Sequence, residues 1–182
     1  DGDAVIAVAN ALMPRFPLVV ATQDWHPPEH ASFAVNNPGR APGEVITLGG
    51  VRPGLWPAHC VQGTRGAEFA EPLALQHITR AFVKGTDPEV DSYSGFFDNQ
   101  RRRATGLAAL LQGRGVDEVV VLGLATDYCV KFTALDALSL GLKTTVVADA
   151  CRGVELTPGD SARALDEIRA AGGAVVTSAE LR

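Results

Sequence analysis

The sequence has few cysteines and no long apolar run. Its three cysteines, Cys60, Cys129 and Cys151, are odd in number and widely spaced, so they do not form the framework of a disulfide-rich secreted domain. No apolar stretch reaches the roughly 20 residues of a membrane span, and no basic start followed by an apolar core marks a signal peptide. We therefore expect a cytoplasmic protein without a membrane partner.

The chain also lacks an excess of basic residues. It carries 16 lysines and arginines against 21 aspartates and glutamates, a net charge of −5, which argues against a surface that binds nucleic acid. A chain of 182 residues with 46% hydrophobic content is long enough to bury a full core without disulfides or a structural metal. We expect residues 1–182 to form one domain, in which any metal serves chemistry.

Short apolar segments of strand composition alternate with segments of helical periodicity. Such alternation predicts an α/β fold in which helices cover a parallel sheet and a ligand binds at the carboxyl ends of the strands. Two long segments rich in proline and glycine follow the first two strands, and loops of that length are usually functional. The expected helices are 4–13, 101–113, 127–140 and one that starts at Pro158 and ends before Gly172, and the expected strands are 18–22, 81–84, 118–122, 143–148 and 174–177.

A carboxylate and several imidazoles lie in the first long loop. Asp24 and His26 are two residues apart just after the first strand, so their side chains point to one side of an extended chain, and His59 follows in the same loop. Two histidines and one carboxylate can hold a catalytic ion such as Zn or Fe and leave coordination positions open. Such residues beside prolines also cap or bridge loops. His30 could join the ligands or fix the loop by hydrogen bonding.

Cys129 lies where an apolar strand turns into a helix. The N–H groups and the dipole of a helix start favour a thiolate, so we expect this thiol to have a lowered pKa and to be a nucleophile. Neighbouring N–H groups could then stabilise an oxyanion. The alternative is a small buried hydrophobic residue, which is the commoner role of a free cysteine and the one expected for Cys60 and Cys151.

Three further residues are expected at the same edge of the sheet. Lys84 ends the second strand, where it is either a solvated charge or, beside a cysteine, a group that stabilises a thiolate or handles a proton. Trp56 and Tyr93 lie in the two long loops over this edge. They either line a pocket for a flat ligand or pack within the loops.

Five motifs occur together in this order: Asp24-Trp25-His26-Pro27, the segment 56–64, Val83-Lys84-Gly85, Tyr93-Ser94-Gly95-Phe96 and the segment 123–130. Together they resemble the nicotinamidase/pyrazinamidase group of the isochorismatase-like cysteine hydrolases, from residue 1 to about residue 178. The resemblance implies a three-layer α/β/α sandwich around a mainly parallel six-stranded sheet. It also implies hydrolysis of nicotinamide, and of pyrazinamide, to the acid and ammonia in NAD salvage.

The resemblance gives the catalytic residues their roles. Cys129 would attack the carboxamide and form a thioester that water cleaves. Lys84 would complete the catalytic group. The Leu124–Ala125 peptide would be cis, and the N–H groups of Ala125 and Cys129 would hold the oxyanion.

The resemblance also implies a metal site and a ring-binding site. One divalent ion, Zn, Fe or Mn, would be bound by Asp24, His26 and His59 and would receive the pyridine nitrogen. Trp56 and Tyr93 would enclose the ring. The residues expected to bind substrate are Trp56, Tyr93, Leu124 and Tyr128. The substrate would be the small-molecule partner, and the resemblance leaves room for a homo-oligomer.

One part of the family pattern has no counterpart here. In this family a catalytic aspartate ends a first strand that precedes the first helix, whereas Asp1 already lies at the start of that helix. We expect that strand, with roughly 20–25 residues, to precede Asp1 in the natural protein, and a chain without it to be inactive and poorly folded. Three other acids are candidates for replacing the missing one, but none lies in a matching sequence context: Asp91, Asp127 and Asp149.

Two other functions stay open on the sequence alone. The chain could be another amide or ureide hydrolase of the same superfamily, with the same pair of cysteine and lysine. It could also be a member that binds a metal or a ligand without catalysis. The metal ligands and Trp56 favour nicotinamide, because coordination to a metal suits a pyridine ring.

Overall fold

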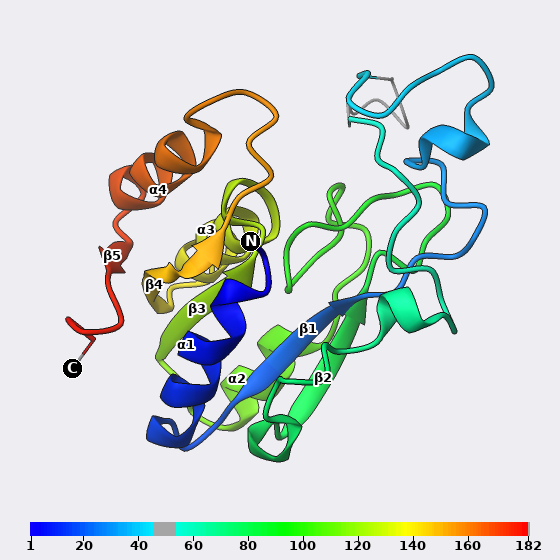
Figure 1. Cartoon of the computed structure of the whole chain (residues 1–182). Helices are drawn as coiled ribbons and strands as arrows, with labels where there is room; N and C mark the ends of the chain where they lie inside the picture. The colour runs from blue at the N-terminus through cyan, green and yellow to red at the C-terminus, as the bar shows by residue number, and fades with distance from the viewer. Residues whose placement is uncertain (46–53, 182) are drawn as a thin grey trace.

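The computed structural model of the chain describes residues 1–45 and 54–181, and its helices and strands alternate as expected (Figure 1). Strands β1 (Val20–Asp24) and β2 (Arg80–Lys84) pair in parallel. Strands β3 (Glu118–Leu124), β4 (Lys143–Arg152) and β5 (Ala174–Val176) form a second parallel sheet in that order. The described residues thus contribute five strands, in two groups, to a fold for which six strands were expected.

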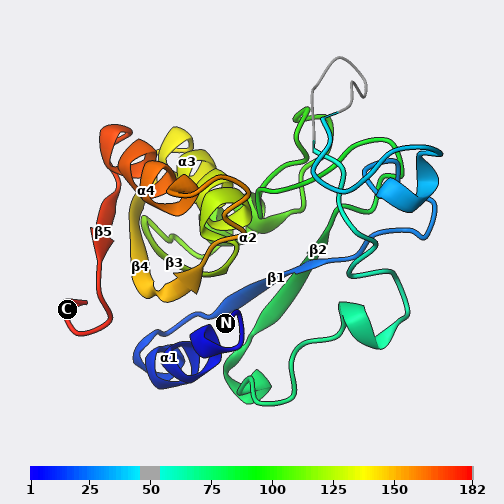
Figure 2. The ribbon, with the colours of Figure 1, turned by 45° about the horizontal axis from the view of Figure 1, so that its top comes forward.

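Four α-helices pack on these strands: α1 (Ala4–Leu12), α2 (Leu107–Gly113), α3 (Lys131–Ser139) and α4 (Asp160–Ala170). The side chains of β4 separate the helices into layers, since successive residues of a strand face opposite sides. Val146 packs in a cluster with residues of α3 and α4, and Val147 packs in another cluster with Leu12 of α1. Figure 2 shows α1 on one side of β3 and β4, with α3 and α4 on the other. The three-layer α/β arrangement is as expected.

The pair β1–β2 has its own apolar contact with the helices. Phe82 of β2 packs against Leu107 and Leu111 of α2 and belongs to the same cluster as Ala137 of α3. Helix α2 therefore links the two groups of strands on the face that also carries α3. No helix among the described residues is both long and apolar enough to cross a membrane.

Several element boundaries differ from the expectation by two or more residues: β1 is Val20–Asp24 instead of 18–22, β3 ends at Leu124 instead of 122, and α3 begins at Lys131 after a wide turn at Thr126–Val130. The helix expected from residue 101 begins only at Leu107, because the Asp98 carboxylate accepts the backbone N–H groups of Arg102 and Arg103 and holds the segment before it in a turn. Gly106, with φ +94, then redirects the chain into the helix. Strand β4 runs on to Arg152, four residues beyond the expected end at 148.

The long segment between β1 and β2 has no α-helix among its described residues, as expected. It contains three single turns, at Ala34–Asn36, Arg65–Ala67 and Leu75–His77. Isolated strand-like pairings bring His26 beside Val61 and Phe33 beside Trp56. These pairings, rather than a regular element, place the side chains of the segment over the carboxyl ends of the strands.

Candidate active site

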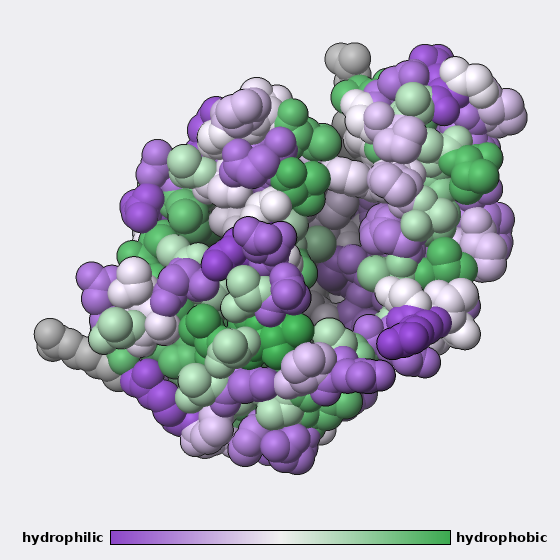
Figure 3. Space-filling model, in the orientation of Figure 1, coloured by the Kyte–Doolittle hydropathy of each residue, from purple (hydrophilic) through white to green (hydrophobic). Residues whose placement is uncertain are grey.

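A small cavity of about 210 Å³ lies at the carboxyl ends of β1, β2 and β3. Asp24 ends β1 and is in register with Lys84, which ends β2, while Leu124 ends β3 just before Cys129. Figure 3 shows the surface hollowed between the part that carries α4 and the loop-rich part of the molecule. The cavity is lined by Asp24, His26, Trp56, His59, Asp91, Ser92, Tyr93, Leu124, Ala125, Tyr128, Cys129 and Val154.

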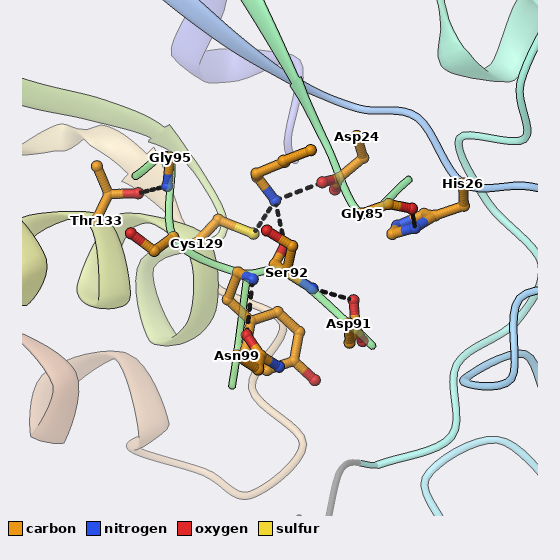
Figure 4. Close-up of polar contacts among 12 residues, drawn as sticks. Asp24, His26, Gly85, Asp91, Ser92, Gly95, Asn99, Cys129 and Thr133 are labelled. Atoms are coloured by element: carbon orange, nitrogen blue, oxygen red, sulfur yellow. Dashed lines mark hydrogen bonds and ion pairs between the residues drawn. The ribbon is translucent and has the colours of Figure 1, made fainter. Parts of the chain in front are cut away.

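Lys84 is almost fully buried and contacts Asp24, Ser92 and Cys129, the three residues labelled around one amine in Figure 4. Its Nζ forms an ion pair with Asp24, donates to the carbonyl oxygen of Ser92 at 2.7 Å, and lies 3.4 Å from the Cys129 sulfur. Burial alone would lower the pKa of Lys84, but the facing Cys129 and Asp24 raise it well above its usual range. Lys84 is therefore a buried ammonium rather than a solvated surface charge.

The pKa of Cys129 was expected to be lowered, and the structure contradicts this. The thiol is half-buried in the cavity wall. Burial raises its pKa above the usual range, although Lys84 and the N–H of Ala125 act in the opposite direction. A helix start lowers a thiol pKa when the thiolate is also solvated, whereas the Cys129 sulfur is largely desolvated. The resting group is thus a thiol beside an ammonium.

The other two cysteines do not line the cavity. All three are free thiols. Cys151 is buried in β4, donates to the carbonyl of Val147 at 3.2 Å, and burial raises its pKa to about 11. Cys60 is half-buried, burial raises its pKa too, and its carbonyl accepts the backbone N–H of His26 at 3.0 Å. Cys129 is therefore the thiol with access to the cavity.

Asp24, His26 and His59 converge on one side of the cavity, where one donor atom of each lies within 4.8 Å of the others. The Nδ1 of His26 lies 2.9 Å from the carbonyl of Gly85, and that of His59 lies 2.8 Å from the carbonyl of Pro57. A carbonyl only accepts, so each Nδ1 carries the proton and each Nε2 keeps its lone pair.

The charge states of these groups also suit a divalent ion. Burial lowers the pKa of His26, which keeps the imidazole neutral. Burial alone would raise the pKa of Asp24, but Lys84 holds it below the usual range. Two imidazoles and one carboxylate are a fitting donor set for Zn, Fe or Mn.

His30 differs from the other two histidines in its hydrogen bonds. It is fully buried, and its Nδ1 accepts the backbone N–H of Ser32 at 3.2 Å, with the Ser32 hydroxyl at 2.8 Å. Burial lowers its pKa, so the ring is neutral and the proton lies on Nε2. That nitrogen has no hydrogen-bond partner among the described residues, although it lies near His26 and Asp91. A protonated Nε2 favours the loop-fixing role for His30 over a ligand role.

Aromatic side chains form another wall of the cavity. The indole N–H of Trp56 donates to the Tyr93 hydroxyl at 3.2 Å, and Tyr128 meets both rings edge-on, with centroid distances of 4.8 and 5.3 Å. The Leu124–Ala125 peptide, which also lines the cavity, is cis, as the resemblance implied. The four residues expected to bind substrate thus all line the cavity.

Hydrogen bonds within the second long loop hold Ser92 and Tyr93 in place, and their partners Asp91 and Asn99 are labelled in Figure 4. The backbone N–H of Tyr93 donates to Asn99 Oδ1 at 3.0 Å, and that of Ser92 donates to Asp91 Oδ1 at 2.8 Å. The N–H of Gly95 donates to Thr133 of α3 at 2.9 Å. The last of these bonds attaches the second long loop to α3, the helix that follows Cys129.

Two lining residues, Ser92 and Val154, were missed by the sequence reasoning, which considered Asp91 only as a substitute for the missing acid. Of the resident acids considered as substitutes, Asp91 lines the cavity, whereas Asp127 and Asp149 accept hydrogen bonds elsewhere. Val154 follows β4, whose expected end lay before it, and a single valine in a loop carries no chemical signal. Its place in the cavity could be found only from the structure.

Comparison with known proteins identifies the family. The family model described as an isochorismatase domain matches residues 5–180. A nicotinamidase of Escherichia coli K12 is 48% identical over 184 residues, which are 99% of this chain and 86% of that protein. The solved Acinetobacter baumanii nicotinamidase/pyrazinamidase has a TM-score of 0.96 at 43% identity, covering 100% of this chain and 87% of the other.

A Pyrococcus horikoshii pyrazinamidase, solved in complex with zinc, has a TM-score of 0.76 and 37% identity, covering 97% of this chain and 86% of the other. The resemblance drawn from the five motifs is confirmed. Because the family model spans almost the whole sequence and the fold agrees over its full length, this chain belongs to the isochorismatase family.

Proposed function

We propose that the protein hydrolyses nicotinamide to nicotinate and ammonia, and pyrazinamide in the same way. The observation that carries the proposal is the contact of the Cys129 sulfur with Lys84 Nζ, at 3.4 Å, in the cavity that also holds three metal-donor side chains. The nicotinamidase relatives support it, since each aligns over nearly the whole chain.

The proposed reaction has two covalent steps. The Cys129 sulfur attacks the carboxamide carbon, a C–S bond forms, the C–N bond breaks, and ammonia leaves with the thiol proton. Water then cleaves the thioester, which gives nicotinate and restores the thiol. Lys84 stabilises the negative charge that develops on the sulfur, and the N–H groups of Ala125 and Cys129 are proposed to hold the carbonyl oxygen as it becomes an oxyanion.

Asp24, His26 and His59 would hold one divalent ion, and the zinc in the Pyrococcus horikoshii pyrazinamidase supports this assignment. Zn, Fe and Mn all suit the donor set. When bound, the ion supplies a Lewis acid to which a pyridine nitrogen can coordinate. The protein's own part is to hold both imidazoles by their Nδ1–H groups, which leaves each Nε2 available to the ion.

The cavity suits one small ring. Its volume of about 210 Å³ is below the roughly 300–1,000 Å³ of sites for drug-sized ligands. Trp56, Tyr93 and Tyr128 would contact the ring, and Leu124 would close the opposite side. A cytoplasmic location is part of the proposal, because the free thiols suit a reducing compartment.

Ammonia release from nicotinamide and pyrazinamide by the full-length, metal-loaded protein tests this function. Cys129→Ala should lower the rate at least about a thousand-fold. Cys151→Ala is the matched control, since it removes a buried thiol outside the cavity and should keep the activity of the folded fraction. Rapid acid quenching should also trap a nicotinoyl thioester on Cys129. No ammonia from the unaltered full-length, metal-loaded protein, or full activity of Cys129→Ala, would refute the proposal.

A further inference from the structure

The loop between β4 and α4 enters the candidate active site at one residue. Val154 is 46% exposed, yet it lines the cavity beside Leu124, Ala125 and Cys129. A half-exposed valine on a loop has little packing to hold it in place. Its position must therefore come from the backbone on either side.

Asp127 holds that backbone. It lies in the wide helical turn Thr126–Val130 that also carries Cys129, and its side chain is buried. Its Oδ1 accepts the N–H of Val154 at 2.9 Å, and its Oδ2 accepts the N–H of Glu155 at 2.8 Å. One carboxylate thus ties two consecutive amides of the loop to the turn of the nucleophile.

The far end of the loop is held by a second carboxylate. Glu155 has a left-handed φ of +57 and accepts the N–H groups of Gly159 and Ser161, each at 2.8 Å, at the start of α4. A Cβ on Gly153 would lie 1.9 Å from the Ser161 hydroxyl oxygen, so the loop approaches α4 closely there. The loop is therefore clamped between the nucleophile turn and α4.

We propose that Val154 determines the size of substrate that the site accepts, and that Asp127 is the positioning residue that keeps Val154 in the cavity wall. The inference rests on the proposed amidase function for its kinetic part. A methyl group on the substrate ring would meet Val154 as long as both hydrogen bonds of Asp127 hold the loop. Asp127 itself does not line the cavity.

The kinetic test compares nicotinamide with a set of ring-methylated nicotinamides on the full-length, metal-loaded protein. The measured quantity is the ratio of kcat/KM for a methylated substrate to kcat/KM for nicotinamide. This ratio does not depend on the fraction of folded enzyme, so a loss of stability alone leaves it unchanged. Val154→Ala should raise the ratio about ten-fold for at least one isomer. Asp127→Asn should raise it for the same isomer, because an amide offers one acceptor oxygen where the carboxylate offers two.

Asp149→Asn is the matched control. Asp149 also accepts a backbone N–H and a hydroxyl, both from Ser178, but it lies outside the cavity lining. The same chemical change there should leave the substrate ratio as it is. An unchanged ratio in both Val154→Ala and Asp127→Asn, or an equal rise in Asp149→Asn, would overturn the proposal.

Hydrogen exchange tests the positioning role without any catalysis. In Asp127→Asn at least one of the Val154 and Glu155 amides should exchange roughly ten-fold faster, while Asp149→Asn leaves both unchanged. Unchanged exchange at both amides in Asp127→Asn would refute the clamp. If the unaltered protein releases no ammonia, the proposed function fails, and the exchange result still decides whether Asp127 holds the loop.

Discussion

Replacing Gly85 with alanine tests how the backbone holds the metal-donor side chains. A Cβ at this position would lie 2.3 Å from Cε1 and 2.5 Å from Nδ1 of the His26 ring. The ring has little space to retreat, because Phe33, His30 and His59 surround it with centroid distances of 5.6, 4.6 and 5.0 Å. Gly85 also has φ +66, which alanine adopts only with strain.

Two costs add in this variant. The left-handed backbone costs about 1 kcal/mol, and overpacking of a buried site costs roughly 1–3 kcal/mol. We expect a loss of about 2–4 kcal/mol in the free energy of unfolding. Because the displaced imidazole also loses its bond to the Gly85 carbonyl, the affinity for zinc should fall about 10- to 100-fold.

Gly63→Ala is the control. Gly63 has φ +72, but no atom lies within 4 Å of the position that its Cβ would take, so alanine there meets the same backbone strain without the contact. Urea unfolding of both variants in the presence of a chelator gives the stability difference, and competition with a chromogenic chelator gives the zinc affinity. If Gly85→Ala matches Gly63→Ala in both measurements, the close approach of Gly85 to His26 does not hold the site as described.

Three further outcomes are expected. Lys84→Met should destabilise the fold by about 3–5 kcal/mol in urea unfolding, because it leaves the partly buried Asp24 carboxylate without its partner. The rate of ammonia release should fall at least about 100-fold. A stable, active variant would contradict the role of the ion pair. Trp56→Phe removes the hydrogen bond to Tyr93 and should raise KM more than it lowers kcat, whereas a change in kcat alone would argue against ring binding. Cys151, with its pKa raised to about 11, should resist iodoacetamide at about pH 8 in the folded chain and react after unfolding; rapid labelling of the native protein would show that it is not buried.

The convergence of the main site residues could be predicted from the sequence. Asp24 and Lys84 end parallel strands and Cys129 follows a third, and parallel strands bring their carboxyl ends to one edge of a sheet. The short spacing between each residue and the end of its strand leaves little freedom in where the side chain lies. The strand pattern and the parallel topology are therefore sufficient to predict that these three residues lie close together.

Features that depend on tertiary packing could not be predicted. The sequence shows Cys129 at a helix start but does not show how much water reaches the sulfur, and burial reversed the expected direction of its pKa. The expected helix at 101 failed because the Asp98 side chain satisfies backbone N–H groups that a helix would otherwise use. The backbone N–H of Val154 is bound by the carboxylate of Asp127, which lies 27 residues earlier in the chain, and no local pattern shows this contact.

The contact of Lys84 with Cys129 connects two parts of the fold. The strand that carries it pairs only with β1 among the described strands, whereas the turn that carries Cys129 follows the other sheet. The 3.4 Å contact between Lys84 Nζ and the Cys129 sulfur therefore connects side chains from elements far apart in the sequence. Phe82, two residues before Lys84, packs against α2 and α3, so the packing that fixes β2 against these helices also sets the distance between the ammonium and the thiol.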